Sequence, residues 1–143
     1  MQESAEVRDA VLAFYERISA GDVDGTAATI ASDPEAFVIG TQRVGPGREQ
    51  WLDSVAENAQ MGIRFQAGPL RAWQVGADAG WAVDEPHLVL PNGLALTTRM
   101  TAVLRRDDDG AFRLLNMHYS WAVPDEVALE RAVAWREELG AAV

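Results

Sequence analysis

The sequence predicts an α+β fold in which helices cover one face of an antiparallel sheet. Helical periodicity dominates residues 4–61, whereas short extended runs separated by turn residues dominate residues 63–123. A last helical segment opens at Pro124. With 143 residues the chain has the length of one domain, and we expect residues 1–143 to form a single domain around one core.

The first helix is predicted over residues 4–20. Ser4 is a suitable N-cap, because its hydroxyl can accept from a free backbone N–H of the first turn, and Gly21 is a suitable terminator. One apolar stripe follows the helical repeat and consists of Val7, Val11, Phe14 and Ile18. This stripe is expected to face the core.

Three shorter elements follow the first helix. Asp22 is expected to cap a short second helix that Asp33 and Pro34 terminate. Residues 36–41, AFVIGT, form an expected strand. Residues 48–61 form an expected third helix, which Gly62 ends; its inward residues are Leu52, Val55 and Ala59.

The second half of the chain is predicted to be a meander of antiparallel strands, because each extended run ends in a turn signal such as PNG or DDDG. The runs are, in order, IRFQAG, LRAWQVG, GWAVDE, HLVLP, LALTTRMTAVLRR and AFRLLNMHYSWAV. A C-terminal helix then begins at 124–126. Its apolar residues Val127, Leu129, Val133, Trp135 and Leu139 are expected to serve packing or a dimer contact.

The DDDG turn sets an expected register for the last two strands. If Asp107–Gly110 is a four-residue loop, Arg106 faces Ala111 and Arg99 faces His118. Because side chains alternate along a strand, one face, termed the His118 face, holds Thr97, Arg99, Thr101, Val103, Arg105, Phe112, Leu114, Asn116, His118 and Ser120. The opposite face, termed the Met117 face, holds Leu96, Thr98, Met100, Ala102, Leu104, Arg113, Leu115, Met117, Tyr119 and Trp121.

Both faces hold large apolar side chains, but the helices can cover only one of them. A second copy of the chain is expected to cover the other, which predicts a homodimer through the outer sheet face. We assign the pocket to the more polar His118 face and the dimer contact to the Met117 face.

The preceding strand contributes an acid, in one of two registers. A three-residue Pro91–Gly93 loop places Glu85 opposite Arg99 and Trp81 opposite Val103. A two-residue turn shifts the strand by one position and brings Asp84 near Thr101. In both cases an acid, an arginine and a histidine are expected on one face.

The pattern of the last two strands resembles the SnoaL-like and kinase-association branch of the nuclear transport factor two-like superfamily, which has a cystatin-like fold. The matching residues are Arg105-Arg106, Asp108–Gly110, Phe112, His118-Tyr119-Ser120 and Pro124. The resemblance implies a curved sheet wrapped by helices into a cone, a pocket inside the cone and a dimer through the outer sheet face. The superfamily includes ketosteroid isomerases, dehydratases, polyketide cyclases and binding or assembly domains. Where kinase-association members carry a pocket arginine this chain has Thr101.

Four residues are the catalytic candidates. His118 could shuttle a proton, or could be a hydrogen-bonded ring within the sheet. Arg99 could hold a carboxylate or enolate, or could pair with Glu85. Asp84 or Glu85 could act as a base with a raised pKa, or could be a solvated acid beside Pro86.

The expected lining of the pocket is mostly aromatic, and Tyr15 could also donate a hydrogen bond to a ligand oxygen. The candidate ligand-binding residues are Tyr15, Phe37, Trp51, Trp81, Thr101, Asn116 and Ser120. Phe14 and Trp73 are further expected wall residues. Two histidines and one acid do not make a metal site, and DDDG lacks the spacing of a calcium loop, so no metal and no cofactor are expected.

Composition excludes several classes of function. The net charge of −10 argues against nucleic acid and anionic membranes, because both require a basic surface. All 12 basic residues are arginine and there is no cysteine, which leaves no lysine for a Schiff base and no thiolate. With no leader and no membrane-spanning run, a cytoplasmic location is expected. Two hypotheses remain, a cofactor-free isomerase, dehydratase or cyclase, and a non-catalytic dimeric ligand-binding or assembly domain.

Overall fold

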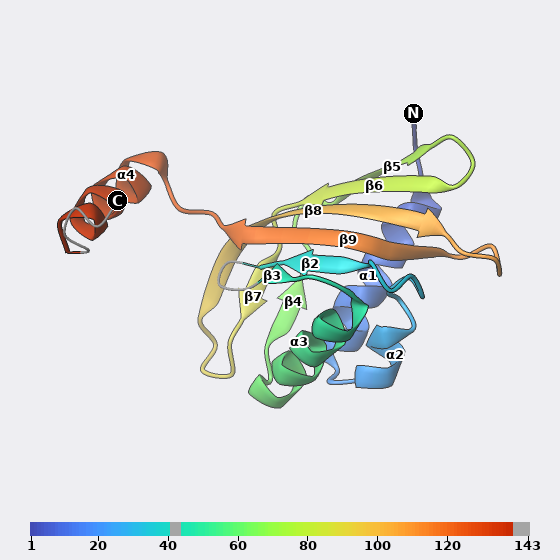
Figure 1. Ribbon diagram of the computed structural model, residues 1–143, viewed down its shortest axis with the longest axis horizontal. Coiled ribbons are helices and arrows are strands. Elements are labelled where there is room, and N and C mark those ends of the chain that lie inside the picture. Colours follow the sequence, from blue (N-terminus) through green and yellow to red (C-terminus); the bar gives the residue numbers. More distant parts are fainter. Residues whose placement is uncertain (41–43, 139–143) are drawn as a thin grey trace.

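The structure is a computed structural model that describes residues 1–40 and 44–138 (Figure 1). Two expected positions, Thr41 of the strand predicted over 36–41 and Leu139 of the last helix, lie outside the described residues, as does the side chain of Trp135.

The helices begin where the sequence predicts them, but the second one ends at Ala27 rather than at Asp33 and Pro34. The helices are α1 (Ala5–Ser19), α2 (Val23–Ala27), α3 (Arg48–Met61) and α4 (Asp125–Glu138).

The expected caps of the first three helices are confirmed. Ser4 accepts from the Val7 N–H at 3.3 Å, and Asp22 accepts from the Gly25 N–H at 2.9 Å. Gly62 ends α3 in the left-handed conformation, with φ of 64°, which glycine adopts without a steric penalty.

The strands form one mixed but mainly antiparallel sheet. They are β1 (Gln2–Glu3), β2 (Phe37–Ile39), β3 (Val44–Gly45), β4 (Arg64–Gln66), β5 (Arg71–Val75), β6 (Ala79–Asp84), β7 (His87–Val89), β8 (Ala95–Arg106) and β9 (Phe112–Trp121). Their order is β1-β5-β6-β8-β9-β2-β3, and β7 pairs with both β4 and β8. The β2–β9 pairing is parallel and the other strand pairs are antiparallel. The predicted α+β class is confirmed.

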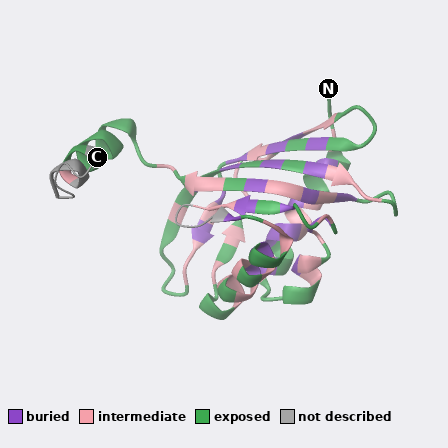
Figure 2. Cartoon of the chain, viewed as in Figure 1, coloured by how far each residue is buried: buried purple, intermediate pink, exposed green. Residues whose placement is uncertain are grey.

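Helices α1, α2 and α3 lie together on one side of the curved sheet, and α4 stands apart beyond the end of β9 (Figure 1). The core forms between this sheet face and the stripe of α1, whose buried residues include Val7, Val11, Phe14 and Ile18 as predicted. Along the long strands buried and exposed residues alternate (Figure 2). No helix of the described chain is long and apolar enough to cross a bilayer.

The β8–β9 register differs from the predicted one. Asp107 and Ala111 close the turn through a backbone hydrogen bond of 2.9 Å, so Arg106 faces Phe112 rather than Ala111. A β-bulge between Val103 and Leu104 then shifts the pairing again. Arg99 therefore faces Ser120, and Thr101 faces His118.

The turn and the bulge each shift the β8–β9 pairing by one residue. Together they shift it by two, which leaves the assignment of side chains to the two faces unchanged beyond the bulge. Beyond the bulge, Thr101 and Val103 share a face with Asn116 and His118, as predicted. Between the bulge and the turn the prediction of faces is wrong for β9, because Phe112 and Leu114 are buried on the Met117 face, whereas Leu104 of β8 is buried there as predicted.

The β6–β8 register follows the three-residue loop. Trp81 faces Val103, and His87 faces Thr97 across the same hairpin. Asp84, opposite Met100, is buried on the Met117 face, whereas Glu85 is exposed after the last residue of β6. The expectation that an acid of this strand shares a face with Arg99 and His118 is therefore wrong for Asp84.

The assignment of the two sheet faces is also wrong. The helices cover the Met117 face, where Met100, Ala102, Leu104 and Met117 are at most 2% exposed. The His118 face is the outer, uncovered one. The reason is the amount of apolar area, because burying the more apolar face removes more hydrocarbon from water.

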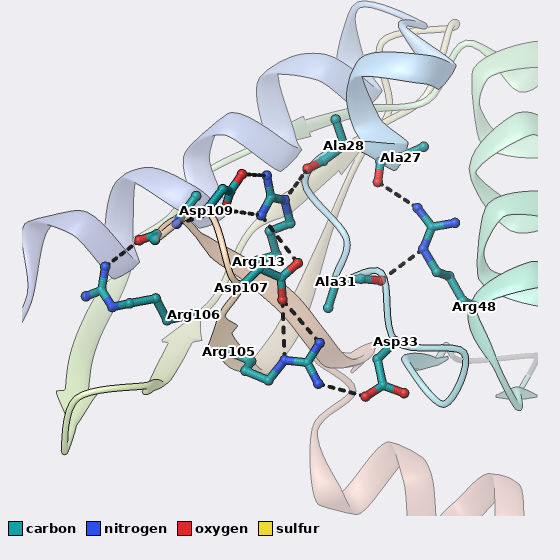
Figure 3. A network of polar contacts seen from close by, with 12 residues as sticks. Ala27, Ala28, Ala31, Asp33, Arg48, Arg105, Arg106, Asp107, Asp109 and Arg113 are labelled. Carbon is teal, nitrogen blue, oxygen red and sulfur yellow. Dashed lines mark hydrogen bonds and ion pairs between the residues drawn. The ribbon is translucent and has the colours of Figure 1, made fainter.

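The DDDG turn is held by arginines (Figure 3). Arg113 binds Asp109 at 2.7 Å and Asp107 at 3.3 Å, and also donates to the Ala28 carbonyl at the end of α2. Arg105 donates to Asp33 at 2.7 Å and to Asp107 at 3.2 Å, and so bridges the two carboxylates. These contacts join the β8–β9 turn to the segment that leads from α2 into β2.

Candidate functional site

The main cavity lies between the helices and the Met117 face. Its volume is about 290 Å³. Phe14 and Ile18 of α1 form one wall, and Trp51 and Val55 of α3 form a second. Met117, with its β9 neighbours Tyr119 and Trp121, forms the sheet side. The walls are therefore mainly aromatic and aliphatic.

Polar groups enter the cavity mostly from α3. Ser54 and Asn58 are four residues apart, and Glu57 lies between them, so all three lie on one side of the helix. The Ser54 hydroxyl donates to the Gln50 carbonyl at 3.0 Å. Tyr119 adds a phenol on the sheet side. A ligand would meet apolar walls and a polar edge along α3.

A second hollow lies beside the DDDG turn and is less suited to a ligand. Its lining includes Arg105, Arg106, Asp107 and Asp108. Arg105 is bound to Asp33, and Arg106 to Glu6 at 2.7 Å, so its cations are already neutralised. The apolar cavity is the better candidate, although its volume is smaller.

Two polar side chains are buried close to the cavity. They are Tyr15 of α1 and Asp84 of β6. The Tyr15 ring is 3% exposed, and its hydroxyl is buried with no hydrogen-bond partner. Burial raises the Tyr15 pKa far above its ordinary value, and the nearby Asp84 charge raises it further. The two groups thus influence each other's pKa, although their geometry falls short of an ordinary hydrogen bond.

Asp84 is held by backbone donors. It accepts from the N–H of Glu85 at 2.9 Å and from that of Gly68 at 3.3 Å. Burial raises the Asp84 pKa, and this effect outweighs the lowering by these hydrogen bonds. Gly68 is required here, because a Cβ at this position would lie 2.3 Å from the Glu85 carbonyl oxygen.

Phe65 separates this pair from the cavity. Its ring stacks on Tyr15 with a centroid distance of 5.4 Å, and its other contacts include Tyr119 at 6.4 Å. Phe65 lines the cavity, whereas Tyr15 and Asp84 do not.

The predicted site residues are divided between the two faces. Trp51 lies in the cavity wall, and Tyr15 and Asp84 lie behind Phe65. The remaining strand candidates belong to the outer His118 face and are Phe37, Trp81, Arg99, Thr101, Asn116, His118 and Ser120. Glu85 is exposed. The predicted convergence of Arg99, His118 and an acid on a helix-covered pocket is therefore wrong.

Sequence reasoning did not identify Phe65, Ser54, Asn58, Met117 and Tyr119 as cavity residues. Two signals were present. The Met117 face is the more uniformly apolar of the two, and residues 51, 54, 55 and 58 follow the helical repeat of α3. Across residues 1–40 and 44–138, no three histidine or acidic side chains converge to hold a metal ion.

An α+β body with a cavity between its helices and a concave sheet defines a cystatin-like protein with a pocket. The family comparison is consistent with this class, since the model of the SnoaL-like domain matches residues 7–125. The chain belongs to the SnoaL-like family, within the nuclear transport factor two-like group, which has isomerase and dehydratase members. No curated protein matches the chain significantly.

Solved structures share the fold at low sequence identity. A Streptomyces avermitilis protein of the nuclear transport factor two-like family, named for a proposed dehydratase activity, is 20% identical with a TM-score of 0.71 and covers 83% of this chain and 95% of its own. A Nostoc punctiforme cystatin-like protein of unknown function is 16% identical, with a TM-score of 0.70 and coverage of 87% and 98%. A proposed calcium/calmodulin-dependent protein kinase type II association domain from Thiobacillus denitrificans is 22% identical, with a TM-score of 0.66 and coverage of 80% and 93%.

Proposed function

We propose that this protein binds a small, mostly apolar organic molecule in the cavity between α1, α3 and the Met117 face. The observation that carries the proposal is the composition of the cavity wall, where Phe14, Trp51, Val55, Phe65 and Met117 surround about 290 Å³. This volume lies near the lower end of the range for small-molecule sites, so the ligand has the size of one or two fused rings.

In the catalytic form of this proposal, the protein is a cofactor-independent isomerase or dehydratase. Asp84 removes a proton next to a ligand carbonyl, because its raised pKa brings it closer to neutral pH than an exposed carboxylate. The Tyr15 hydroxyl, which has no partner, donates to the resulting oxyanion. Both roles require Phe65 to turn away from Tyr15, since it separates the pair from the cavity.

The alternative is a non-catalytic, dimeric binding or assembly domain. The outer face favours a dimer, because Phe37, Trp81 and Val103 are 37%, 37% and 41% exposed on one side of the sheet. We propose that a second copy of the chain covers this face. Dimerisation is compatible with either use of the cavity.

Binding is tested with 2-tetralone, an uncharged bicyclic ketone, by titration followed by NMR and thermal denaturation. Ser54→Trp places a ring at the edge of the cavity, and Ser54→Ala at the same position leaves the cavity open. The wild type and Ser54→Ala are expected to bind the ketone, and Ser54→Trp to bind at least about tenfold more weakly. Equal binding by all three proteins would place the ketone elsewhere.

Catalysis is tested by exchange of the acidic hydrogens of 2-tetralone in D₂O. If the chain is an enzyme, the wild type accelerates the exchange, and Asp84→Asn binds the ketone but exchanges it no faster than buffer does. Binding without exchange in the wild type would favour the non-catalytic alternative for this ligand class.

A further inference from the structure

We infer that helix α4 of one copy docks on the outer His118 face of a second copy, so that two chains exchange their C-terminal helices. The inference rests on the dimer proposed above and identifies which segment of the partner covers the face. It follows from an unpartnered helix, an unpartnered sheet face and their opposite charges.

Among the residues that the structure describes, helix α4 has no extensive packing against the rest of its chain. It stands beyond the end of β9 (Figure 1), and its residues for which burial is described are mostly exposed (Figure 2). Leu129 and Val133 are 67% and 59% exposed and lie four residues apart, so they form an apolar strip on one side. Isolated helices of this length are marginal in water, so α4 needs a packing surface.

The outer face offers such a surface. Trp73 and Trp81 stack with centroids 4.8 Å apart, and Val103 lies next to Trp81 across the strands. Four neighbouring strands span about 15–20 Å, and a 14-residue helix is about 21 Å long. The helix therefore matches the width of the sheet from β5 to β9.

Charge complementarity favours a second copy as the source of the helix. The α4 segment carries five acidic residues and two arginines. The His118 face carries Arg99, and also Arg71, which is paired with Glu3 of β1 at 3.5 Å. Arg99 is therefore the cation of this face that an acidic helix would meet. Two copies with a net charge of −10 each repel overall, so a local match of opposite charges is needed for association.

The connection to α4 directs it away from its own sheet. The Ala122 N–H donates to the Thr97 carbonyl at 3.1 Å, which fixes the chain against the first residues of β8, and Pro124 follows. From this point the helix extends outward (Figure 1). Reciprocal docking of two such helices closes a twofold dimer with the same contact made twice.

Cross-linking tests the inference directly, because the chain has no cysteine of its own. Leu129→Cys and Val103→Cys proteins are mixed at equal concentration and joined by a flexible bis-maleimide. The expected result is a product that contains one chain of each kind. Both positions are exposed in the single chain, so neither change should prevent folding.

Sedimentation of full-length variants supplies the matched control. Val133→Glu places a carboxylate in the apolar strip and is expected to weaken the dimer at least about tenfold. Val127→Glu adds the same charge on the other side of α4 and is expected to have little effect on the dimer.

Three other outcomes would contradict the exchange of helices. They also show whether the proposed dimer itself is wrong. A Val103→Cys product linked to itself, with none linked to Leu129→Cys, would show a dimer formed by sheet packing alone. A Leu129→Cys/Val103→Cys double variant that cross-links only within one chain would show α4 folded onto its own sheet. A wild type that sediments as a monomer would contradict the dimer and the exchange together.

Discussion

The aromatic ring of Phe65 stacks on that of Tyr15, with centroids 5.4 Å apart and planes 16° from parallel. Phe65 faces the cavity, and Tyr15 lies behind it next to Asp84. The stack shields from the cavity a phenol that has no hydrogen-bond partner. The stack therefore lies between the cavity and two titratable groups, Tyr15 and Asp84, whose pKa is raised by burial.

Phe65→Ala is expected to lower the pKa of Tyr15, because water from the cavity would then reach its hydroxyl. Phe65 is half-buried, and the change should reduce the free energy of unfolding by about 2–3 kcal/mol. NMR of ¹³C-labelled tyrosine, which resolves Tyr15 from Tyr119, measures the pKa. Phe65→Leu keeps an apolar cover and should leave the pKa raised. An unchanged Tyr15 pKa in the alanine variant would contradict the shielding role of Phe65.

Tyr15→Phe is expected to leave the protein as stable as the wild type or to stabilise it by up to about 1 kcal/mol. The substitution removes a buried hydroxyl that has no partner and keeps the ring contacts. Urea denaturation measures the change. Thr98→Val is the matched comparison, because the buried Thr98 hydroxyl donates to the Pro86 carbonyl at 3.0 Å and its loss should cost about 1 kcal/mol. A larger loss for Tyr15→Phe than for Thr98→Val would show that the Tyr15 hydroxyl is bonded.

Asp84→Asn is expected to change how stability depends on pH. Burial raises the folded-state pKa of Asp84 above its ordinary value of 3.8, so the native state binds a proton more readily than the unfolded chain does. The stabilising contribution of Asp84 is thus complete below that value and is lost as the pH rises through the folded-state pKa. Asparagine keeps one of the two acceptor oxygens, because Gly68 donates to Oδ2 and Glu85 to Oδ1, and it does not titrate.

The stability of Asp84→Asn relative to the wild type should therefore increase as the pH rises above 3.8 and should level off above the folded-state pKa of Asp84. Urea denaturation across this range of pH measures the difference in the free energy of unfolding between the two proteins. The pH dependence of all other groups is common to both proteins and cancels in this difference. Asp53→Asn, at an exposed position of α3, provides the control. A difference that stays constant with pH would contradict the raised pKa.

Met117 and His118 are neighbours on β9 that point to opposite faces, so alanine at each should give opposite results. Met117 is 1% exposed, and Met117→Ala should cost about 2–5 kcal/mol and change the affinity for 2-tetralone. His118 is exposed on the outer face, and His118→Ala should change stability by less than about 0.5 kcal/mol and leave ketone binding unchanged. Loss of ketone binding in His118→Ala would contradict the position of the cavity.

Local features of the fold could be predicted because they depend on neighbouring residues. Ser4 and Asp22 cap helices whose stripes are visible in the sequence, and Gly62 ends α3 where predicted. The sequence allows two registers at Pro91–Gly93, and β6 and β7 follow the one with a three-residue loop. Each of these features is determined within a few residues along the chain.

The β8–β9 pairing could not be read from its turn alone. The Asp107–Ala111 closure and the bulge after Val103 each shift the register by one residue, and neither has a strong local signal. The bulge separates the buried side chains of Leu104 and Leu114 from the polar residues further along the strands. Predictions of faces for β9 near the turn therefore failed, while those further along the strands succeeded.

The sequence by itself determined the α+β class, the starts of the helices, the end of α3 at Gly62, and the division of the last two strands into a polar and an apolar face beyond the bulge. Only the tertiary structure decided which face the helices cover, and with it the separation of Tyr15, Trp51 and Asp84 from Arg99 and His118. The physical reason is that alternation along a strand defines two faces without ordering them. That order comes from the total apolar area that all the elements together remove from water.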